Sequence, residues 1–492
     1  MIQFFKGLCL FGLLGFSLGN DIDIHPFLVD NNTEVDFLVN YRGSNNSDNS
    51  YKFVSAWNYS PRIIDLVRND THECMRKCAY NNNCLGVYQL LEEDYPCYLL
   101  SKLGYPIRTN ETSTSYIKTQ HQRFTNNNFS IMSKFKNFDY ILLFCILLLG
   151  FISLATMYST DGGKILFHTK SHFVKLITFT LMMLVFSFIN IKFWFLIGYF
   201  FYVIVIGLLI WTYLFGIKSS GSQRWIDLYF INLQPSELMK ICIILCLAKF
   251  FHRMKLESVN SIYTILTSLI IILLPMGLVI VQPDLGTSLL ISISGIAVLW
   301  FAGINHKYFI YTMLGFIISL PFIISFLKPY QKLRVLTFLN PDRDPLGAGY
   351  QIIQSKIAVG SGGIFGKGFL KGTQSYLEFL PEKHTDFIFT LFSEEFGFIG
   401  SVILLLIYAI IVYRIVRIGA LSRSYFAKLF CYSFAAAIFV YIVINMSMVL
   451  GLLPIVGSPL PIMSYGGSSM LATMIGFGIV MSAKVHSQQA IA

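Results

Sequence analysis

The residues best suited to chemistry are an acid and two cations in one long hydrophilic segment, residues 328–386. Asp386 ends this segment, and an apolar run of about 27 residues, long enough for a membrane helix, follows at once. We therefore expect Asp386 at a boundary between water and membrane, at the start of a helix. An ionisable group there is costly unless it is used, so Asp386 is a candidate functional acid. The alternative is a carboxylate that only stabilises the helix N-terminus.

The two cations, Arg334 and Lys356, precede a glycine-rich turn, Ser361-Gly362-Gly363. Glycine allows main-chain amides to approach a phosphate closely, so this combination fits an anion site at the membrane surface. A solvated loop with scattered charges explains the same residues equally well.

The elements that must position these groups are membrane helices. The chain has 492 residues, of which 55% are hydrophobic and 13% charged, and apolar runs of about 20 residues recur from Tyr140 onward. Such runs predict an all-α polytopic membrane protein, because lipid offers no other partner for main-chain polar groups. The ten predicted spans are 139–159, 173–191, 193–216, 236–251, 262–281, 286–304, 307–327, 387–413, 427–450 and 465–484.

The net charge of +11 does not indicate nucleic acid, because the basic residues mostly flank the apolar runs, as membrane topology requires. A pyrophosphate-bearing lipid is the anionic partner that fits this setting.

Other polar residues lie at the ends of predicted spans. Glu237 and Lys240 are spaced to pair on one helix face, and a capped helix with a local ion pair is the favoured interpretation. Asp284 follows Pro283 in a break between two apolar runs, where it forms a tight turn or caps the next helix. The irregular stretch 457–469 must be buried in protein or line a wet cavity.

The first part of the chain has a different composition. Residues 1–19 are typical of a secretory signal or a short anchor, and residues 20–137 are polar and rich in asparagine. Four cysteines cluster there, Cys74, Cys78, Cys84 and Cys97. Their even number behind a signal-like start favours two disulfides over a zinc site, which CxxC pairs would indicate.

The cysteine spacing, with Gly86-Val87-Tyr88 and Cys97-Tyr98-Leu99, resembles a PAN/apple module, a small α+β domain. The resemblance implies the pairs Cys74–Cys97 and Cys78–Cys84, and a role in binding protein or carbohydrate outside the cell.

Four separated motifs in residues 138–488 resemble the SEDS proteins of bacterial cell elongation and division. They are Gln282-Pro283-Asp284-Leu285-Gly286-Thr287, Asp344-Pro345-Leu346-Gly347-Ala348-Gly349-Tyr350-Gln351, Leu380-Pro381-Glu382-Lys383-His384-Thr385-Asp386-Phe387-Ile388-Phe389 with Glu394-Glu395, and Pro459-Leu460-Pro461 with Ser464-Tyr465-Gly466-Gly467-Ser468. The stretch 354–375, with Lys356, is similar to the RodA branch rather than to FtsW.

The resemblance implies a ten-helix fold and a peptidoglycan glycosyltransferase that polymerises lipid II during wall elongation, with a class B penicillin-binding protein as transpeptidase partner. The essential acid of the family matches Asp386. The remaining important positions divide into substrate-binding and structural residues. Those matched to substrate binding are Lys356, Arg334, Arg224, Trp225, Asp284, Glu394 and Ser464, and those matched to structural roles are Glu237 and Lys240.

The residues suit this reaction. Extension of a glycan requires a base to take the proton of a sugar hydroxyl, and cations to hold the departing pyrophosphate. We expect Asp386 to be the base, and Lys356 and Arg334, aided if required by a divalent ion (Mg or Mn), to hold the pyrophosphate. The sequence shows no dedicated cluster of metal ligands. A lipid II flippase is the alternative function, and an adhesion protein with a membrane anchor is a third.

Basic residues mark the cytosolic side of membrane spans, and their distribution predicts that residues 328–386 lie outside the cell. We expect the protein in the plasma (inner) membrane. With ten spans, the segment before Tyr140 is then cytosolic, whereas its signal-like start and cysteines indicate the outside. Two explanations remain open. In the first, residues 1–137 are a foreign exon joined to a bacterial-type reading frame, by fusion or an error in the gene model. In the second, one of the predicted helices does not insert into the membrane.

Overall fold

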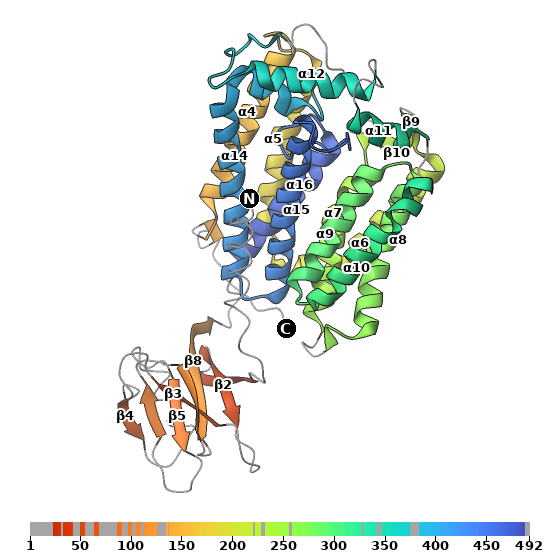
Figure 1. Cartoon of the computed structure of the whole chain (residues 1–492). Helices are drawn as coiled ribbons and strands as arrows, with labels where there is room; N and C mark the ends of the chain where they lie inside the picture. Colours follow the sequence, from red (N-terminus) through yellow and green to blue (C-terminus); the bar gives the residue numbers. More distant parts are fainter. Residues whose placement is uncertain are drawn as a thin grey trace. The chain divides into compact units, whose positions relative to one another are not determined.

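The structure is a computed structural model. It describes residues 134–135, 137–219, 222–227, 232–254, 258–326, 329–340, 344, 347–373 and 383–487, and the main chain of eight strands before residue 130. The chain divides into two compact units, residues 1–130 and 131–492, which are described separately (Figure 1).

The first unit is built on antiparallel strands. A six-stranded sheet has the order β1-β2-β8-β5-β6-β4, and β3 pairs with β7. The strands are β1 (Asp23–Asp30), β2 (Thr33–Arg42), β3 (Ser50–Val54), β4 (Ile63–Val67), β5 (Gly86–Leu90), β6 (Cys97–Leu100), β7 (Tyr105–Thr109) and β8 (Ser113–Phe124). The predicted signal segment, Cys74, Cys78, Cys84 and the Cys97 side chain lie outside what the structure describes. The PAN/apple-like module and its disulfides therefore stay predictions.

The second unit is a bundle of apolar helices with short elements at one end. The long helices are α4 (Tyr140–Thr160), α5 (Phe167–Phe188), α6 (Ile191–Phe215), α7 (Pro235–His252), α8 (Ile262–Val281), α9 (Leu285–Phe301), α10 (His306–Phe326), α14 (Ile388–Leu421), α15 (Tyr425–Val449) and α16 (Gly467–Val485). The short elements are α11 (Pro329–Leu339), α12 (Ala348–Ser361) and the strands β9 (Ile217–Ser219), β10 (Ser222–Asp227) and β11 (Asn232–Leu233).

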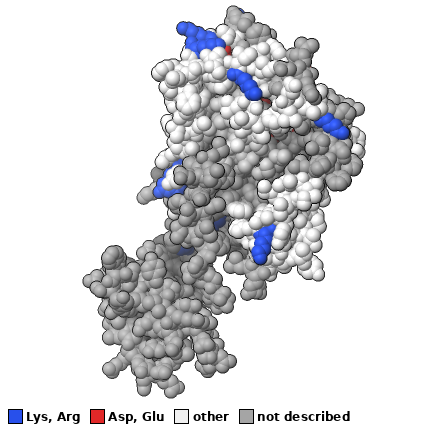
Figure 2. Space-filling model, viewed as in Figure 1, with Lys and Arg blue, Asp and Glu red and all other residues white. Residues whose placement is uncertain are grey.

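A helix lies at every position where the sequence predicts a span. Among the described residues, 7 helices are long and apolar enough to cross a membrane. The chain is therefore a multi-pass membrane protein, and the count of ten spans stays a prediction. The face drawn in Figure 2 is mostly uncharged where it is described, with a few separate basic residues. Large apolar side chains such as Leu196 and Phe200 on α6 are exposed, as a surface that contacts lipid requires.

Helix α14 continues beyond its predicted end at residue 413 as far as Leu421. The prediction stopped where the apolar run meets Arg414, but charged residues continue a helix as well as apolar ones do. Arg414 forms an ion pair with Asp139, with 2.5 Å between Nη2 and Oδ2. Asp139 also caps α4, because its Oδ1 accepts a hydrogen bond from the Leu142 amide. One buried acid thus joins the start of α4 to the far part of α14.

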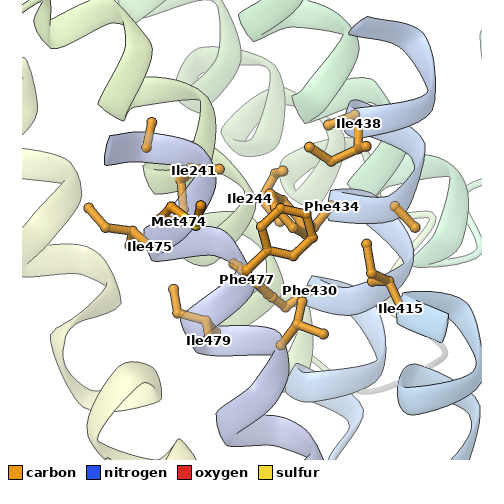
Figure 3. Packing of buried hydrophobic residues seen from close by; sticks show 14 of the residues in the cluster. Ile241, Ile244, Ile415, Phe430, Phe434, Ile438, Met474, Ile475, Phe477 and Ile479 are labelled. Atoms are coloured by element: carbon orange, nitrogen blue, oxygen red, sulfur yellow. The ribbon is translucent and has the colours of Figure 1, made fainter. Parts of the chain in front are cut away.

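The core of the bundle lies around α16, which packs against α5, α7, α14 and α15. Phe434 on α15 meets Phe477 on α16 edge to face, with ring centroids 5.4 Å apart (Figure 3). Gly476 makes this approach possible, because a Cβ there would overlap the Phe434 ring. In lipid, the hydrophobic effect does not drive helices together, so they associate by close van der Waals packing. Small residues at the contacts allow the helices to approach closely enough for it.

The chain after α12 is joined to the beginning of α14 by main-chain hydrogen bonds. Lys367 and Gly368 donate amide hydrogens to the carbonyls of Glu394 and Glu395 at 3.0 Å each. Phe398 donates in turn to the carbonyl of Gly363 at 2.9 Å. The two backbones approach closely at Gly397, whose positive φ of 66° interrupts the helix. Residues 363–368 and the first turns of α14 therefore form one continuous piece of structure.

Candidate active site

Asp386 lies in a turn, residues 383–387, directly before α14. The helix N-cap is Phe387, which makes no capping hydrogen bond through its side chain. Asp386 is half-buried, and the side-chain amide of Asn445 donates to its main-chain oxygen at 2.9 Å. The same amide donates to the carbonyl of Ser458 at 2.7 Å. Asn445 thus attaches the Asp386 turn to the irregular connection between α15 and α16.

The carboxylate of Asp386 faces this connection. A Cβ placed on Gly457 would lie 3.4 Å from Asp386 Oδ2, and Gly457 has a positive φ of 71°. Gly457 is thus the neighbour of the carboxylate on this side, and a Cβ there would be in van der Waals contact with it.

Lys356 and Arg334 approach the same connection from α12 and α11. The end of the exposed Lys356 side chain lies against Gly451, where a Cβ would overlap it. Arg334 is also exposed, and its Nη1 lies 3.4 Å from the carbonyl oxygen of Ile455. The structure therefore brings the two predicted cations and the predicted acid to one stretch of chain, residues 451–457.

Arg224 and Asp284, which are 60 positions apart in the sequence, meet in an ion pair of 3.4 Å. Asp284 is buried and caps α9 through the Thr287 amide, as one of the two sequence interpretations expects. Gln234 also donates to Asp284, at 3.2 Å, and Arg224 donates to the carbonyl of Pro283. Trp225 is half-buried beside Arg224 in strand β10. This cluster fixes the connection between α8 and α9.

The predicted pair of Glu237 and Lys240 is present and buried, with 2.7 Å between Oε1 and Nζ. Lys240 Nζ also lies 4.3 Å from the centre of the Tyr441 ring. The three residues line a cavity of about 20 Å3, which is room for one water molecule. The Tyr441 hydroxyl is buried there without a hydrogen-bond partner among the described residues, so a water in the cavity would satisfy it.

Glu394 and Ser464 hold main-chain segments in place. Glu394 is fully buried, and Lys367 Nζ lies 2.6 Å from its Oε1, which also accepts from the amide and hydroxyl of Thr373. Ser464 Oγ accepts from the Leu460 amide at 2.7 Å and closes the turn before α16.

Sequence reasoning missed two groups near Asp386. Asn445 lies within an apolar run, and a buried polar residue in a membrane span is a functional candidate by default, so a signal was present. Asp161, His168 and His384 each offer one atom that could coordinate a metal ion, and these atoms lie within 4.8 Å of one another. Their positions in the sequence gave no sign of this grouping.

The fold and the site together define a polytopic membrane protein with an acid and cations gathered at one end of its helix bundle. A family model described as FTSW_RODA_SPOVE, cell cycle protein, matches residues 135–489. The chain belongs to this family, the SEDS proteins, as the sequence motifs predicted.

Curated relatives agree with this assignment. The chain is 46% identical over 286 residues to "Peptidoglycan glycosyltransferase MrdB" of Escherichia coli (strain K12), which covers 58% of this chain and 77% of the relative. It is 34% identical over 356 residues to "Probable peptidoglycan glycosyltransferase FtsW" of Buchnera aphidicola subsp. Baizongia pistaciae, covering 70% and 93%. The greater identity to MrdB fits the RodA-like branch.

Solved structures share the fold. One, described as "Structural coordination of polymerization and crosslinking by a peptidoglycan synthase complex", has a TM-score of 0.63 and 29% identity, covering 72% of this chain and 99% of that chain. The crystal structure of Thermus thermophilus RodA has a TM-score of 0.54 and 23% identity, covering 72% and 98%. At that identity, the second match supports the fold alone.

Proposed function

We propose that this protein is a peptidoglycan glycosyltransferase of the RodA-like branch, which polymerises lipid II into glycan strands during wall elongation. The observation that carries the proposal is the convergence of Asp386, Lys356 and Arg334 on residues 451–457. The relatives with the same family assignment are named peptidoglycan glycosyltransferases.

Asp386 is the general base. The hydroxyl of the acceptor sugar attacks the anomeric carbon of the donor, and a new glycosidic bond forms as the bond to the lipid pyrophosphate breaks. Asp386 takes the hydroxyl proton, and the pyrophosphate leaves with the electron pair. A single acid is sufficient for this inverting transfer, because the leaving group departs without protonation. A positioned base contributes about 100- to 10,000-fold to such reactions.

Lys356 and Arg334 hold the pyrophosphate. Their side chains are exposed, so a lipid headgroup can reach them, and both lie against the connection that also faces Asp386. Negative charge increases on the pyrophosphate as it leaves, so fixed cations stabilise the transition state more than the ground state. Arg224, Trp225, Asp284, Glu394 and Ser464 are assigned to substrate binding as well, on the match of their motifs to the family.

The decisive experiment measures polymer formed from purified lipid II in detergent. Asp386→Asn keeps the size of the side chain and removes the base, so we expect folded protein that binds lipid II without polymerising it. Asp227→Asn, at an exposed acid in β10, is the matched control and should retain activity. Normal polymerisation by Asp386→Asn would remove the base assignment. Lipid II movement across vesicles without polymer formation would instead favour a flippase.

A second experiment tests the pyrophosphate site. We expect Lys356→Ala to lower kcat/KM by about 100-fold, and Lys356→Arg to restore part of it, because the charge returns with different geometry. Lys307→Ala, at an exposed lysine where α10 begins, is the control for lost charge. Equal rates for Lys356→Ala and Lys307→Ala would contradict the assignment.

The partner we assign is a class B penicillin-binding protein, since uncrosslinked glycan needs a transpeptidase. The similar solved chain belongs to a complex described as coordinating polymerisation and crosslinking. Copurification of this chain with its cognate transpeptidase from membranes tests the assignment.

The orientation we assign places residues 328–386 outside the plasma membrane, which a cysteine at exposed Lys371 tests. A maleimide that cannot cross the membrane should label Lys371→Cys in intact cells. The parent protein gives the background, to which buried Cys145, Cys242, Cys246 and Cys431 should add little.

Residues 20–137 are assigned as a separate binding module with the disulfides Cys74–Cys97 and Cys78–Cys84. Transcript reads that continue from Asn126 to Asp139 would show that the module and the membrane unit share one message. Reads that stop between them would establish a mis-joined gene model.

A further inference from the structure

The connection between α15 and α16 contains a strained turn, residues 461–464, which we call the Ile462 turn. Ile462 has a φ of 66°, which glycine adopts readily and a β-branched residue adopts only at a steric cost. Its side chain is 2% exposed and belongs to the hydrophobic core of the bundle. Such a conformation persists only where the surrounding structure holds it, and it is typical of functional sites. We therefore expect this turn to have a function.

Tyr408 on α14 holds the peptide unit that precedes Ile462. The Tyr408 hydroxyl donates to the carbonyl oxygen of Pro461 at 2.7 Å. The φ of Ile462 is the rotation of this planar peptide unit about the N–Cα bond, so a hydrogen bond that fixes the carbonyl also fixes φ. Tyr408 is buried, and its hydrogen bond is therefore protected from competition with water.

Ser153 on α4 holds the chain on the other side of Ile462. Its hydroxyl donates to the carbonyl oxygen of Met463 at 2.8 Å. Ser153 Oγ also lies 2.7 Å from Nε2 of His172 on α5, and His172 donates in this second hydrogen bond because the hydroxyl has only one hydrogen. Both side chains are fully buried. The Ile462 turn is thus held by α14 on one side and by α4 and α5 on the other.

The segment 458–465, which contains the Ile462 turn, is attached to the Asp386 turn at both ends. At one end, the main-chain amide of Tyr465 donates to the carbonyl of His384 at 2.8 Å. At the other end, a single side-chain amide from α15 donates to the main-chain oxygens of Ser458 and Asp386. One short segment of chain therefore fixes two points of the Asp386 turn, two residues apart.

We propose that Tyr408 and Ser153 are positioning residues for Asp386, which act by holding the Ile462 turn in its strained conformation. The proposal rests on the role of Asp386 as base. Relaxation of Ile462 to a negative φ would change the path of residues 458–465, and the carboxylate would move relative to the acceptor sugar. A displacement of about 1 Å can cost about 100-fold in rate. Loss of either positioning residue should therefore lower kcat and leave KM nearly unchanged.

The first experiment measures kcat and KM for lipid II polymerisation by the full-length protein, with the thermal midpoint of each variant as the folding control. We expect Tyr408→Phe to lower kcat by about tenfold and to change KM by less than about twofold. Tyr202→Phe is the matched control, because the Tyr202 hydroxyl also donates to a main-chain carbonyl, that of Ile271, at 2.8 Å. It should lower the thermal midpoint to a similar extent and leave kcat unchanged.

Ser153→Ala removes the second hydrogen bond and should show the same loss of kcat. The double variant with Tyr408→Phe should be no more than about twofold slower than the slower single variant, because both substitutions release one turn. Ser482→Ala, near the end of α16, is the matched control. The buried Ser482 hydroxyl donates to the carbonyl of Ile189 at 2.6 Å, and its loss should leave kcat unchanged.

Two substitutions at Ile462 test the strain independently of activity. Ile462→Ala and Ile462→Gly both remove the buried side chain beyond Cβ, but only glycine adopts a positive φ without steric cost. At an ordinary φ, glycine is the less stable of the two, because it loses more conformational entropy on folding. We expect the reverse order here, with a higher thermal midpoint for Ile462→Gly than for Ile462→Ala.

Each other outcome has a defined meaning. Normal kcat in folded Tyr408→Phe or Ser153→Ala, an equal loss of kcat in Tyr202→Phe, or a raised KM at unchanged kcat would overturn the positioning role. Multiplicative losses of kcat in the double variant, or a higher thermal midpoint for Ile462→Ala than for Ile462→Gly, would overturn the strained turn as its cause. An active Asp386→Asn would instead refute the base assignment, whereas an inactive Asp386→Asn beside a normal Tyr408→Phe would refute only the positioning role.

Discussion

The side-chain amide of Asn445 donates a hydrogen bond of 2.9 Å to the main-chain oxygen of Asp386. Asn445→Ala would leave this oxygen and that of Ser458 without their donor, at a cost of about 1–3 kcal/mol for each buried group. We expect a lower thermal midpoint and a lower kcat for lipid II polymerisation. Ser433→Ala on the same helix removes a buried hydroxyl that has no partner among the described residues, so it should leave both values unchanged. Equal behaviour of the two variants would contradict a role for Asn445.

Gly457 and Gly162 provide a matched pair with φ of 71° and 72°. Replacement by alanine strains the backbone at both positions by about 1–2 kcal/mol. Only at Gly457 does the new methyl group contact Asp386, since the space around Gly162 is open. We expect similar losses of thermal stability in the two variants and a loss of kcat in Gly457→Ala alone. Equal activity would mean that the space beside Asp386 is not used.

The buried ion pair of Glu237 and Lys240 should be more sensitive to loss of one partner than of both. Glu237→Gln or Lys240→Met leaves an unpaired charge beside Tyr441, at a cost of about 3–5 kcal/mol. The double variant contains neither charge and should recover part of that loss. Thermal unfolding in detergent measures the difference. A double variant less stable than both single variants would contradict the expectation.

His486, just beyond the end of α16, should make folding stability depend on pH. Its burial and the nearby charge of Lys134 lower the pKa of His486, although a hydrogen bond with the Ser482 carbonyl opposes this. The neutral form is therefore favoured in the folded state. The resulting stability is present above the unfolded pKa of about 6.5 and is lost as the pH falls through the lower folded value. The thermal midpoint should fall less steeply with acidification in His486→Gln than in the parent, and identical slopes would count against the assignment.

Local patterns predicted much of the fold. The apolar runs located the long helices, the spacing of Glu237 and Lys240 predicted their ion pair, and the position of Asp284 allowed its role as a cap. Each of these depends on residues close together in the sequence, where helix geometry determines which side chains meet.

Contacts between distant segments were beyond sequence reasoning. Arg224 was identified without Asp284 as its partner, and His384 was identified as part of a motif without His168. Glu394 was assigned to substrate, a role that stays a prediction, while the structure describes its contacts with Lys367 and Thr373. Such contacts depend on how the helices pack and how the chain connects them. A single sequence contains no periodic pattern that predicts them.

The hydrogen bonds that join residues 363–368 to α14 have a mechanical consequence. Lys356 is on α12, before these hydrogen-bonded residues, and Asp386 directly precedes α14. A force on one helix is therefore transmitted to the other through main-chain hydrogen bonds. A neighbouring protein that binds this region and displaces it would move α12 and the start of α14 as one rigid body. Asp386 and Lys356 would then keep their separation and move together relative to residues 451–457.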